Sequence, residues 1–297
     1  MNGQMLDFVT LDVFTDQPFG GNPLAIFPNG CGLETATMQA IASELNLSET
    51  VFITYPDGQE TPRIRIFTPK VELPFAGHPL VGTAIFLAEE ARVAGRAEIV
   101  METAAGTVRG EVQSDAEGLT RAFITAPHAP VSGPAGSGEA AAATLGLTLE
   151  DLAFAPSAYS AGVPYVFVPV ASRALLSRVS LDLTRWKESF RDAWASAIFA
   201  YTMDDWMCGS QVHGRMFGPG VGIPEDPATG SAAAALTGVL RDIQKLDECD
   251  AEWNLFQGED MGRPSSIRIQ ASISEGAVKQ ARIGGTAVRR IVGKMRL

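Results

Sequence analysis

The hydrophobic pattern of the chain predicts many short strands and two strongly apolar helices. Segments rich in β-forming residues are separated by turns with Gly and Pro, as in Leu6 to Phe14 and Val51 to Tyr55, which is typical of strands. The stretch from Pro79 to about Ala94 is apolar on almost every side in its first two turns, and Ala232 to Leu240 has the same character. Because a helix that is apolar all round is buried on every side, we expect strands wrapped around two central helices.

Two stretches about 150 residues apart resemble each other. Arg65 to Ala84 and Arg215 to Leu240 each read as a strand, a polar loop with prolines and a helix start, with Pro79 expected at the first helical position. Gly21 to Pro28 and Gly162 to Pro169 form a second similar pair in the same order. Ordered similarity of this kind indicates an internal duplication, although chance similarity between two such units is the alternative.

These features predict an α+β fold of two similar domains, each a mostly antiparallel, barrel-like sheet around its central helix. The chain lacks the regular alternation of strands and helices that a doubly wound sheet requires. A Pro- and Gly-rich linker at 126–138 places the domains at 1–128 and 129–297. Val278 to Ile283 and Ala287 to Met295 read as two last strands, and the sequence leaves open whether the final strand packs on the N-terminal domain.

Composition narrows the class of protein. The chain has 297 residues, 46% of them hydrophobic and 19% charged, as in ordinary globular proteins. The net charge of −11 argues against nucleic acid or an anionic membrane as a partner. The three cysteines are scattered, with no metal-binding spacing, and fit a reducing compartment. With no signal peptide and no apolar run of about 18 residues, we expect a cytoplasmic protein without a metal site.

Glu49 is the first candidate for chemistry. It stands where a polar turn enters an apolar strand, and the matching position of the second half carries Ser196. A duplicated fold has a cleft between its halves, and a carboxylate at the mouth of an apolar cleft has a raised pKa, which suits general acid–base catalysis. The alternative is a solvated glutamate at the end of a strand.

Further candidates lie at the starts of the two central helices. His78 is the histidine of the duplicated loops, and a capping or core role is its alternative. Asp226 precedes the second helix, where its charge also complements the helix dipole. Gly230 and Ser231 offer backbone N–H groups and a hydroxyl to a substrate carboxylate, or form an ordinary N-cap. Gly77 is their counterpart in the first half.

Taken together, several motifs resemble the phenazine-biosynthesis PhzF-like isomerase family nearly from end to end. They are Asp12 to Pro23, Leu47 to Phe52, Phe75 to Pro79, Gly222 to Ala232 and Gln257 to Ser265. The family is similar in fold to diaminopimelate epimerase, with two like domains and an active site between them. This agrees with the duplication inferred from the repeats.

The resemblance implies that Glu49 moves a proton within the substrate, with His78 and Asp226 beside it, and that Gly230 and Ser231 bind a carboxylate. It also implies a dihydro-3-hydroxyanthranilate-like substrate, no metal or organic cofactor, and a homodimer. The related racemases use a cysteine near each central helix start. This chain has none in either loop, so racemisation by two thiols is not expected.

Two other functions stay open at this point. The first is an epimerase or tautomerase that uses the same Glu49 on another small acid. The second is a non-catalytic protein that binds small molecules on this fold. The presence of Glu49, His78, Asp226 and Ser231 together argues against the second.

Overall fold

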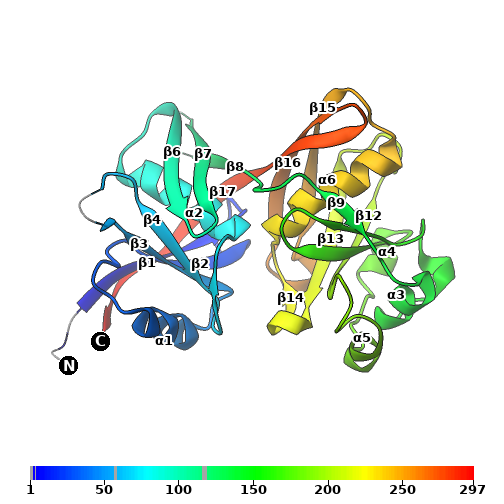
Figure 1. The fold of residues 1–297 in the computed structure, drawn as a ribbon, viewed down its shortest axis with the longest axis horizontal. Coiled ribbons are helices and arrows are strands. Elements are labelled where there is room, and N and C mark those ends of the chain that lie inside the picture. Colours follow the sequence, from blue (N-terminus) through cyan, green and yellow to red (C-terminus); the bar gives the residue numbers. More distant parts are fainter. Residues whose placement is uncertain (1–2, 4, 57–58, 116–118) are drawn as a thin grey trace. The chain divides into compact units, whose positions relative to one another are not determined.

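The computed structural model describes residues 3, 5–56, 59–115 and 119–297. The chain forms two compact units (Figure 1). Unit 1 comprises Met1–Thr125 and Gly284–Leu297, and unit 2 comprises Ala126–Ile283. The division into domains at 128/129 stays a prediction.

Unit 1 is built from a barrel-like sheet and two helices. Its elements are β1 (Met5–Val13), β2 (Asn22–Phe27), α1 (Thr35–Leu45), β3 (Glu49–Thr54), β4 (Arg63–Phe67), β5 (Glu72–Leu73), α2 (Gly77–Glu90), β6 (Gly95–Thr103), β7 (Gly106–Ser114), β8 (Thr120–Thr125) and the distal part of β17 (Ala277–Arg296).

The strands of unit 1 close on themselves. β17 pairs with β1, β1 with β2, β2 with β3, β3 with β4, β4 with β6, β6 with β7, β7 with β8, and β8 returns to β17. The β2–β3 and β4–β6 pairs are parallel. The β17–β1, β1–β2, β3–β4, β6–β7 and β7–β8 pairs are antiparallel. A closed sheet leaves no free edge, and its interior has to be filled.

The helix α2 provides that filling. Buried residues occupy almost all of its length, from Gly77 to Phe86 and Ala88. Gly82 lets β1 and β2 come close, because a Cβ atom there would lie 2.7 Å from Leu24 and 2.8 Å from Val13. The apolar character that predicted a buried helix is therefore confirmed. The helix starts two residues earlier than expected, so Pro79 is its third residue rather than its first.

Unit 2 repeats the same kinds of element. They are β9 (Val131–Gly133), α3 (Gly138–Thr144), β10 (Ser157–Ser160), β11 (Pro164–Pro169), α4 (Arg173–Leu176), α5 (Leu183–Ser189), β12 (Ala197–Met203), β13 (Gln211–Gly218), β14 (Ile223–Asp226), α6 (Gly230–Gln244), β15 (Cys249–Gln257) and β16 (Ser265–Ser274), with short 3-10 helices at Leu149–Asp151, Pro219–Val221 and Glu259–Met261.

The order of strand pairing in unit 2 matches that of unit 1. β10 pairs antiparallel with β11, β11 parallel with β12, β12 antiparallel with β13, β13 parallel with β15, and β15 antiparallel with β16. The short β14 folds back on β13 as β5 folds back on β4. The predicted α+β class is confirmed, and the matching order is compatible with the duplication, which stays a prediction.

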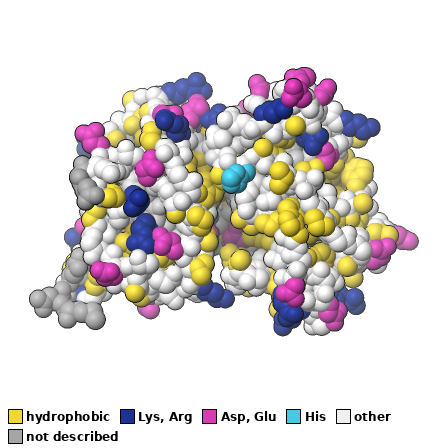
Figure 2. All heavy atoms as spheres, in the orientation of Figure 1, with side chains coloured by type: hydrophobic (Ala, Val, Ile, Leu, Met, Phe, Trp, Pro, Cys, Tyr) yellow, Lys and Arg dark blue, Asp and Glu magenta, His cyan; other side chains and the backbone are white. Residues whose placement is uncertain are grey.

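The second central helix, α6, is buried from Gly230 to Leu240 except at Ser231. Gly238 allows the close approach of β10, because a Cβ atom there would lie 2.5 Å from the ring of Tyr159. The surface is polar by comparison, and Figure 2 shows acidic and basic side chains interspersed over the face that it draws. Among the described residues, no helix is both long and apolar enough to cross a membrane.

Candidate active site

In unit 1, the Glu49 carboxyl and the His78 imidazole lie side by side. Glu49 is the first residue of β3, where it pairs with Leu24 of the parallel strand β2. His78 lies in the first turn of α2. His78 Nε2 is 3.4 Å from Glu49 Oε2, and the two side chains are 5% and 12% exposed. The sheet and the central helix thus bring together two residues that are far apart in sequence.

Burial determines the charge of His78. Because desolvation disfavours the charged imidazolium, it lowers the pKa of His78 to about 3. The contact with Glu49 is therefore one between a carboxyl group and a neutral imidazole at neutral pH, rather than an ion pair between two charged groups. A neutral imidazole can donate from one ring nitrogen and accept at the other, so it can orient a neighbouring carboxyl group without neutralising it.

In unit 2, Asp226 ends β14 and is 5% exposed. Its carboxylate accepts a hydrogen bond of 2.5 Å from the hydroxyl of Thr229, the residue that precedes α6. The loop between Asp226 and α6 is therefore closed by a local side-chain contact. A carboxylate that accepts hydrogen bonds in this way is held in one orientation.

Gln257 holds the same loop through three hydrogen bonds of its side-chain amide. Its amide Nε2 donates to the backbone oxygen of Asp226 (2.7 Å) and to Thr229 Oγ1 (3.0 Å), and its Oε1 accepts from the backbone N–H of Thr229 (3.2 Å). Gln257 is fully buried. The Ser265 hydroxyl donates to the backbone oxygens of Pro227 and Gln257, so the whole loop is part of one buried polar network.

The start of α6 offers hydrogen-bond donors. Gly230 is its first residue and is buried, and Ser231 is the second. The Ser231 hydroxyl lies 2.7 Å from the hydroxyl of Tyr165 on β11. The first N–H groups of a helix have no acceptor within the helix, and the helix dipole favours an anion there. The turn can therefore bind a carboxylate.

The structure places Glu49, Gly77 and His78 together in unit 1, and Asp226, Gly230 and Ser231 together in unit 2. Sequence reasoning missed the parts played by Thr229, Gln257 and Tyr165. Gln257 stood in one of the recognised motifs, but nothing in its spacing indicated that it binds the Asp226 loop.

None of the three cysteines stands at a central helix start. Cys31 and Cys208 are exposed, Cys249 begins β15, and all three are free. No group of three or more His, Cys, Asp or Glu side chains within the described part of the chain is arranged to hold a metal ion.

Comparison with known proteins gives the family. The model of the phenazine biosynthesis-like proteins, PhzC-PhzF, matches residues 11–293. The chain is 41% identical to an uncharacterized isomerase of Mesorhizobium japonicum, over 98% of this chain and 99% of that one. It is 34% identical to the trans-2,3-dihydro-3-hydroxyanthranilate isomerase of Pseudomonas chlororaphis, over 96% of this chain and 97% of that one.

Solved structures agree with this result. The PhzF-family phenazine biosynthesis protein of Bacillus anthracis superposes with a TM-score of 0.87 at 26% identity, over 98% of this chain and 99% of that one. A hydroxyproline epimerase of Agrobacterium vitis shares the fold, with a TM-score of 0.64 at 11% identity, over 100% and 93% of the two chains. The fold is thus that of the epimerase-like isomerases. The chain belongs to the phenazine biosynthesis-like family and is an isomerase.

Proposed function

We propose that the protein isomerises a small carboxylate substrate, similar to dihydro-3-hydroxyanthranilate, by moving one proton between two of its carbons. The observation that carries this proposal is the partly buried Glu49 carboxyl beside the neutral His78 imidazole. The 34% identity to a trans-2,3-dihydro-3-hydroxyanthranilate isomerase over almost the whole chain supports the choice of substrate.

In this proposal Glu49 is the acid and base. Its carboxylate removes a proton from one carbon of the substrate, and the resulting carboxylic acid returns it to another carbon, so that the enzyme ends in its starting state. One carboxyl group is enough for such a shuttle when the two carbons are within its reach. His78 orients the Glu49 carboxyl, and its neutral state leaves the acid–base equilibrium to Glu49.

In this proposal, the first turns of the two central helices bind the substrate. Gly230 and Ser231 bind the substrate carboxylate through the first turn of α6. The Asp226 carboxyl is a polar group next to this binding position. Gly77 lies in the equivalent turn of α2, and in this proposal its backbone N–H also binds the substrate. That both units contribute to one site remains a prediction from the sequence, as do the homodimer and the cytoplasmic location.

The test is NMR spectroscopy in D2O with trans-2,3-dihydro-3-hydroxyanthranilate. The wild-type protein is expected to convert it, with deuterium appearing at a ring carbon because the proton held by Glu49 exchanges with D2O before it is returned. Glu49→Gln is expected to reduce the rate about 1,000-fold, within the range for loss of a general acid–base. Glu98→Gln is the matched control, because Glu98 is an exposed strand glutamate of the same unit.

The outcomes separate the two parts of the proposal. Unchanged turnover in Glu49→Gln would exclude Glu49 as the proton shuttle. No turnover by folded wild-type protein would exclude this substrate, and the same exchange experiment on other small carboxylates would then test the shuttle alone.

A further inference from the structure

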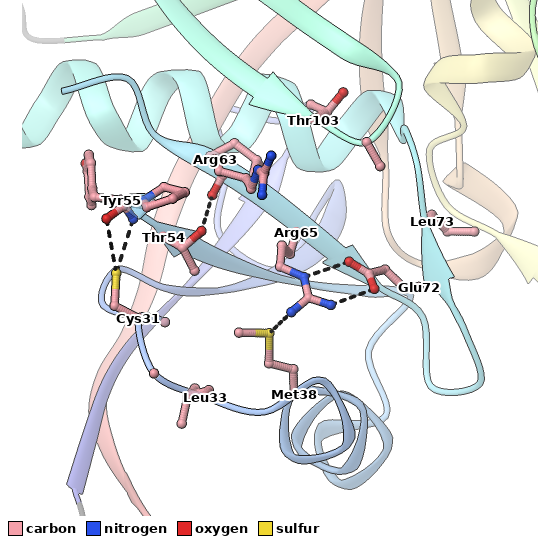
Figure 3. A pocket seen from close by; sticks show the side chains of 15 residues that line it. Cys31, Leu33, Met38, Thr54, Tyr55, Arg63, Arg65, Glu72, Leu73 and Thr103 are labelled. Carbon is pink, nitrogen blue, oxygen red and sulfur yellow. Dashed lines mark hydrogen bonds and ion pairs between the residues drawn. The ribbon is translucent and has the colours of Figure 1, made fainter. Parts of the chain in front are cut away.

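A cavity of about 640 Å³ opens in unit 1 beside β4 (Figure 3). Neither Glu49 nor His78 lines it. Its lining combines the charged residues Arg63, Arg65 and Glu72 with apolar residues such as Leu33, Met38 and Leu73. Sites for small molecules have volumes of about 300–1,000 Å³ and combine apolar walls with a few polar groups, so this cavity has the size and lining of a ligand site.

Arg65 has one guanidinium nitrogen with only a weak partner. Its Nε and Nη2 donate to the two carboxylate oxygens of Glu72 (2.8 and 2.7 Å), and Nη2 also donates to the Thr35 hydroxyl. Its Nη1 contacts the sulfur of Met38 at 3.3 Å, as Figure 3 shows. A thioether sulfur is a poor acceptor, so Nη1 can still bind a better one.

In unit 2, the guanidinium nitrogen that corresponds to Arg65 Nη1 binds backbone carbonyl oxygens. Arg215 of β13 corresponds to Arg65 of β4. Each arginine forms a bidentate ion pair with a glutamate, and each guanidinium group lies over the ring of a phenylalanine two residues later. Arg215 Nη1, however, donates to the backbone oxygens of Leu176 (3.2 Å) and Val179 (2.8 Å). The segment at the end of α4 thus supplies carbonyl oxygens to this nitrogen, where unit 1 has the Met38 sulfur and the adjoining cavity.

Arg63 adds a positive charge to the same wall. It lies two residues before Arg65 on β4, and residues two apart in a strand share a face. Among the described residues its guanidinium group makes no hydrogen bond and no ion pair, whereas its backbone pairs with the neighbouring strands β3 and β6. Two arginines and Glu72 leave one net positive charge on the wall, which favours a ligand with a single negative charge.

We propose that this cavity binds a small organic carboxylate with an apolar body. The carboxylate oxygens accept from Arg63 and from Arg65 Nη1, in the position where unit 2 uses its own carbonyl oxygens. The apolar body packs against Leu33, Met38 and Leu73, which also line the cavity. The site is separate from the groups assigned to catalysis, so it is independent of the proposed reaction.

Cys31 gives a local readout of this site. It is exposed, lines the cavity, and accepts a hydrogen bond from the backbone N–H of Tyr55 at 3.1 Å. Cys208 of unit 2 is also exposed, and its hydrogen bond to Asp205 raises the pKa of its thiol. The rate of alkylation of each cysteine by iodoacetamide, followed by peptide mass spectrometry, therefore compares the cavity with a distant internal control.

The probe is sodium benzoate, and benzamide is its neutral match in shape. Benzoate is expected to slow alkylation of Cys31 to a saturating limit, to leave Cys208 unchanged, and to act in Glu49→Gln as in the wild type. Arg63→Ala is expected to weaken the benzoate effect about tenfold, the factor for loss of one charge-assisted hydrogen bond. Arg109→Ala, an exposed arginine of the same unit, is expected to change nothing.

Four results would overturn the proposal. Benzamide could protect Cys31 as well as benzoate does, which would show that charge is not recognised. Arg63→Ala could leave the benzoate effect intact, or benzoate could have no effect at any concentration. Alkylation of Cys31 could instead fall with protein concentration in the absence of benzoate, which would show that a second copy of the chain covers the cavity.

Discussion

The first turns of α2 and α6 have very different surroundings. At α2, the partly buried Glu49 lies beside a histidine that burial keeps neutral. At α6, Thr229 and Gln257 bind both the carboxylate and the backbone of Asp226 through a buried network. The side chains at the start of α2 are a carboxyl group and a neutral imidazole in direct contact, whereas the loop before α6 is fixed by several hydrogen bonds. Chemistry is therefore expected to depend on the start of α2 and stability on the loop before α6, and the following experiments test this contrast.

The largest effect is expected from pH, acting through His78. Its pKa is about 3 in the folded protein and about 6.5 in the unfolded chain, so the unfolded state binds more protons between these values. Stability is fully present above about pH 6.5 and is lost as pH falls towards 3. Between about pH 7 and about pH 4.5 this loss amounts to about 2–3 kcal/mol.

Urea unfolding at the two pH values measures this loss, and His78→Gln is the comparison because it cannot titrate. The wild type is expected to lose about 2–3 kcal/mol more than the variant does. An equal loss in both proteins would show that His78 is protonated in the native state at acidic pH and that its burial does not control its charge.

A smaller effect is expected at the α6 end. Gln257→Ala removes the partners of buried groups on Asp226 and Thr229, which costs about 2 kcal/mol of unfolding free energy. Gln270→Ala is the control, because the Gln270 amide donates to Glu252 and accepts from Arg282 and takes no part in this network. It should change stability by less than about 0.5 kcal/mol. Equal stability of the two variants would mean that the network does not hold the loop.

The smallest effect on stability is expected from Glu49→Gln, the variant with the largest expected effect on rate. A neutral amide beside a neutral imidazole removes the cost of burying a charge, so the unfolding free energy should change by less than about 1 kcal/mol. Thermal or urea unfolding at neutral pH gives the answer. Destabilisation by more than about 2 kcal/mol would assign Glu49 to the framework rather than to the chemistry.

Much of the fold could be predicted because it follows from local patterns. The apolar character of 79–94 and 232–240 predicted both central helices, and the structure has them at Gly77–Glu90 and Gly230–Gln244. Their ends were less accurate, because neither helix has a side-chain hydrogen bond at its N-cap to mark the start.

The C-terminal strand shows why a local pattern can mislead. Two strands were expected at 278–283 and 287–295, and the structure has a single strand, β17, of 20 residues. The strand continues through Gly284, which lies between the two predicted segments. A Cβ atom at this position would lie 2.5 Å from the backbone oxygen of Ala122. The glycine permits a close approach between strands, which depends on a distant part of the chain.

For the candidate site, too, some features could be predicted from the sequence and others could not. Residue types and motifs selected Glu49 and His78, but their contact of 3.4 Å depends on how β3 packs beside α2. The roles of Thr229 and Gln257 were not predicted, because their hydrogen bonds join segments 28 residues apart. The catalytic and binding roles of all these residues remain predictions until the variants are measured.

The course of β17 also sets an order for folding during synthesis. Its residues up to Ile283 belong to unit 2, and those from Gly284 belong to unit 1, where they pair with β1 along Met5 to Val13. The barrel of unit 1 therefore stays open while the ribosome makes the whole of unit 2. Since domains usually fold as they emerge, N-terminal part first, this chain reverses the usual sequence: the part made first is the last to be completed.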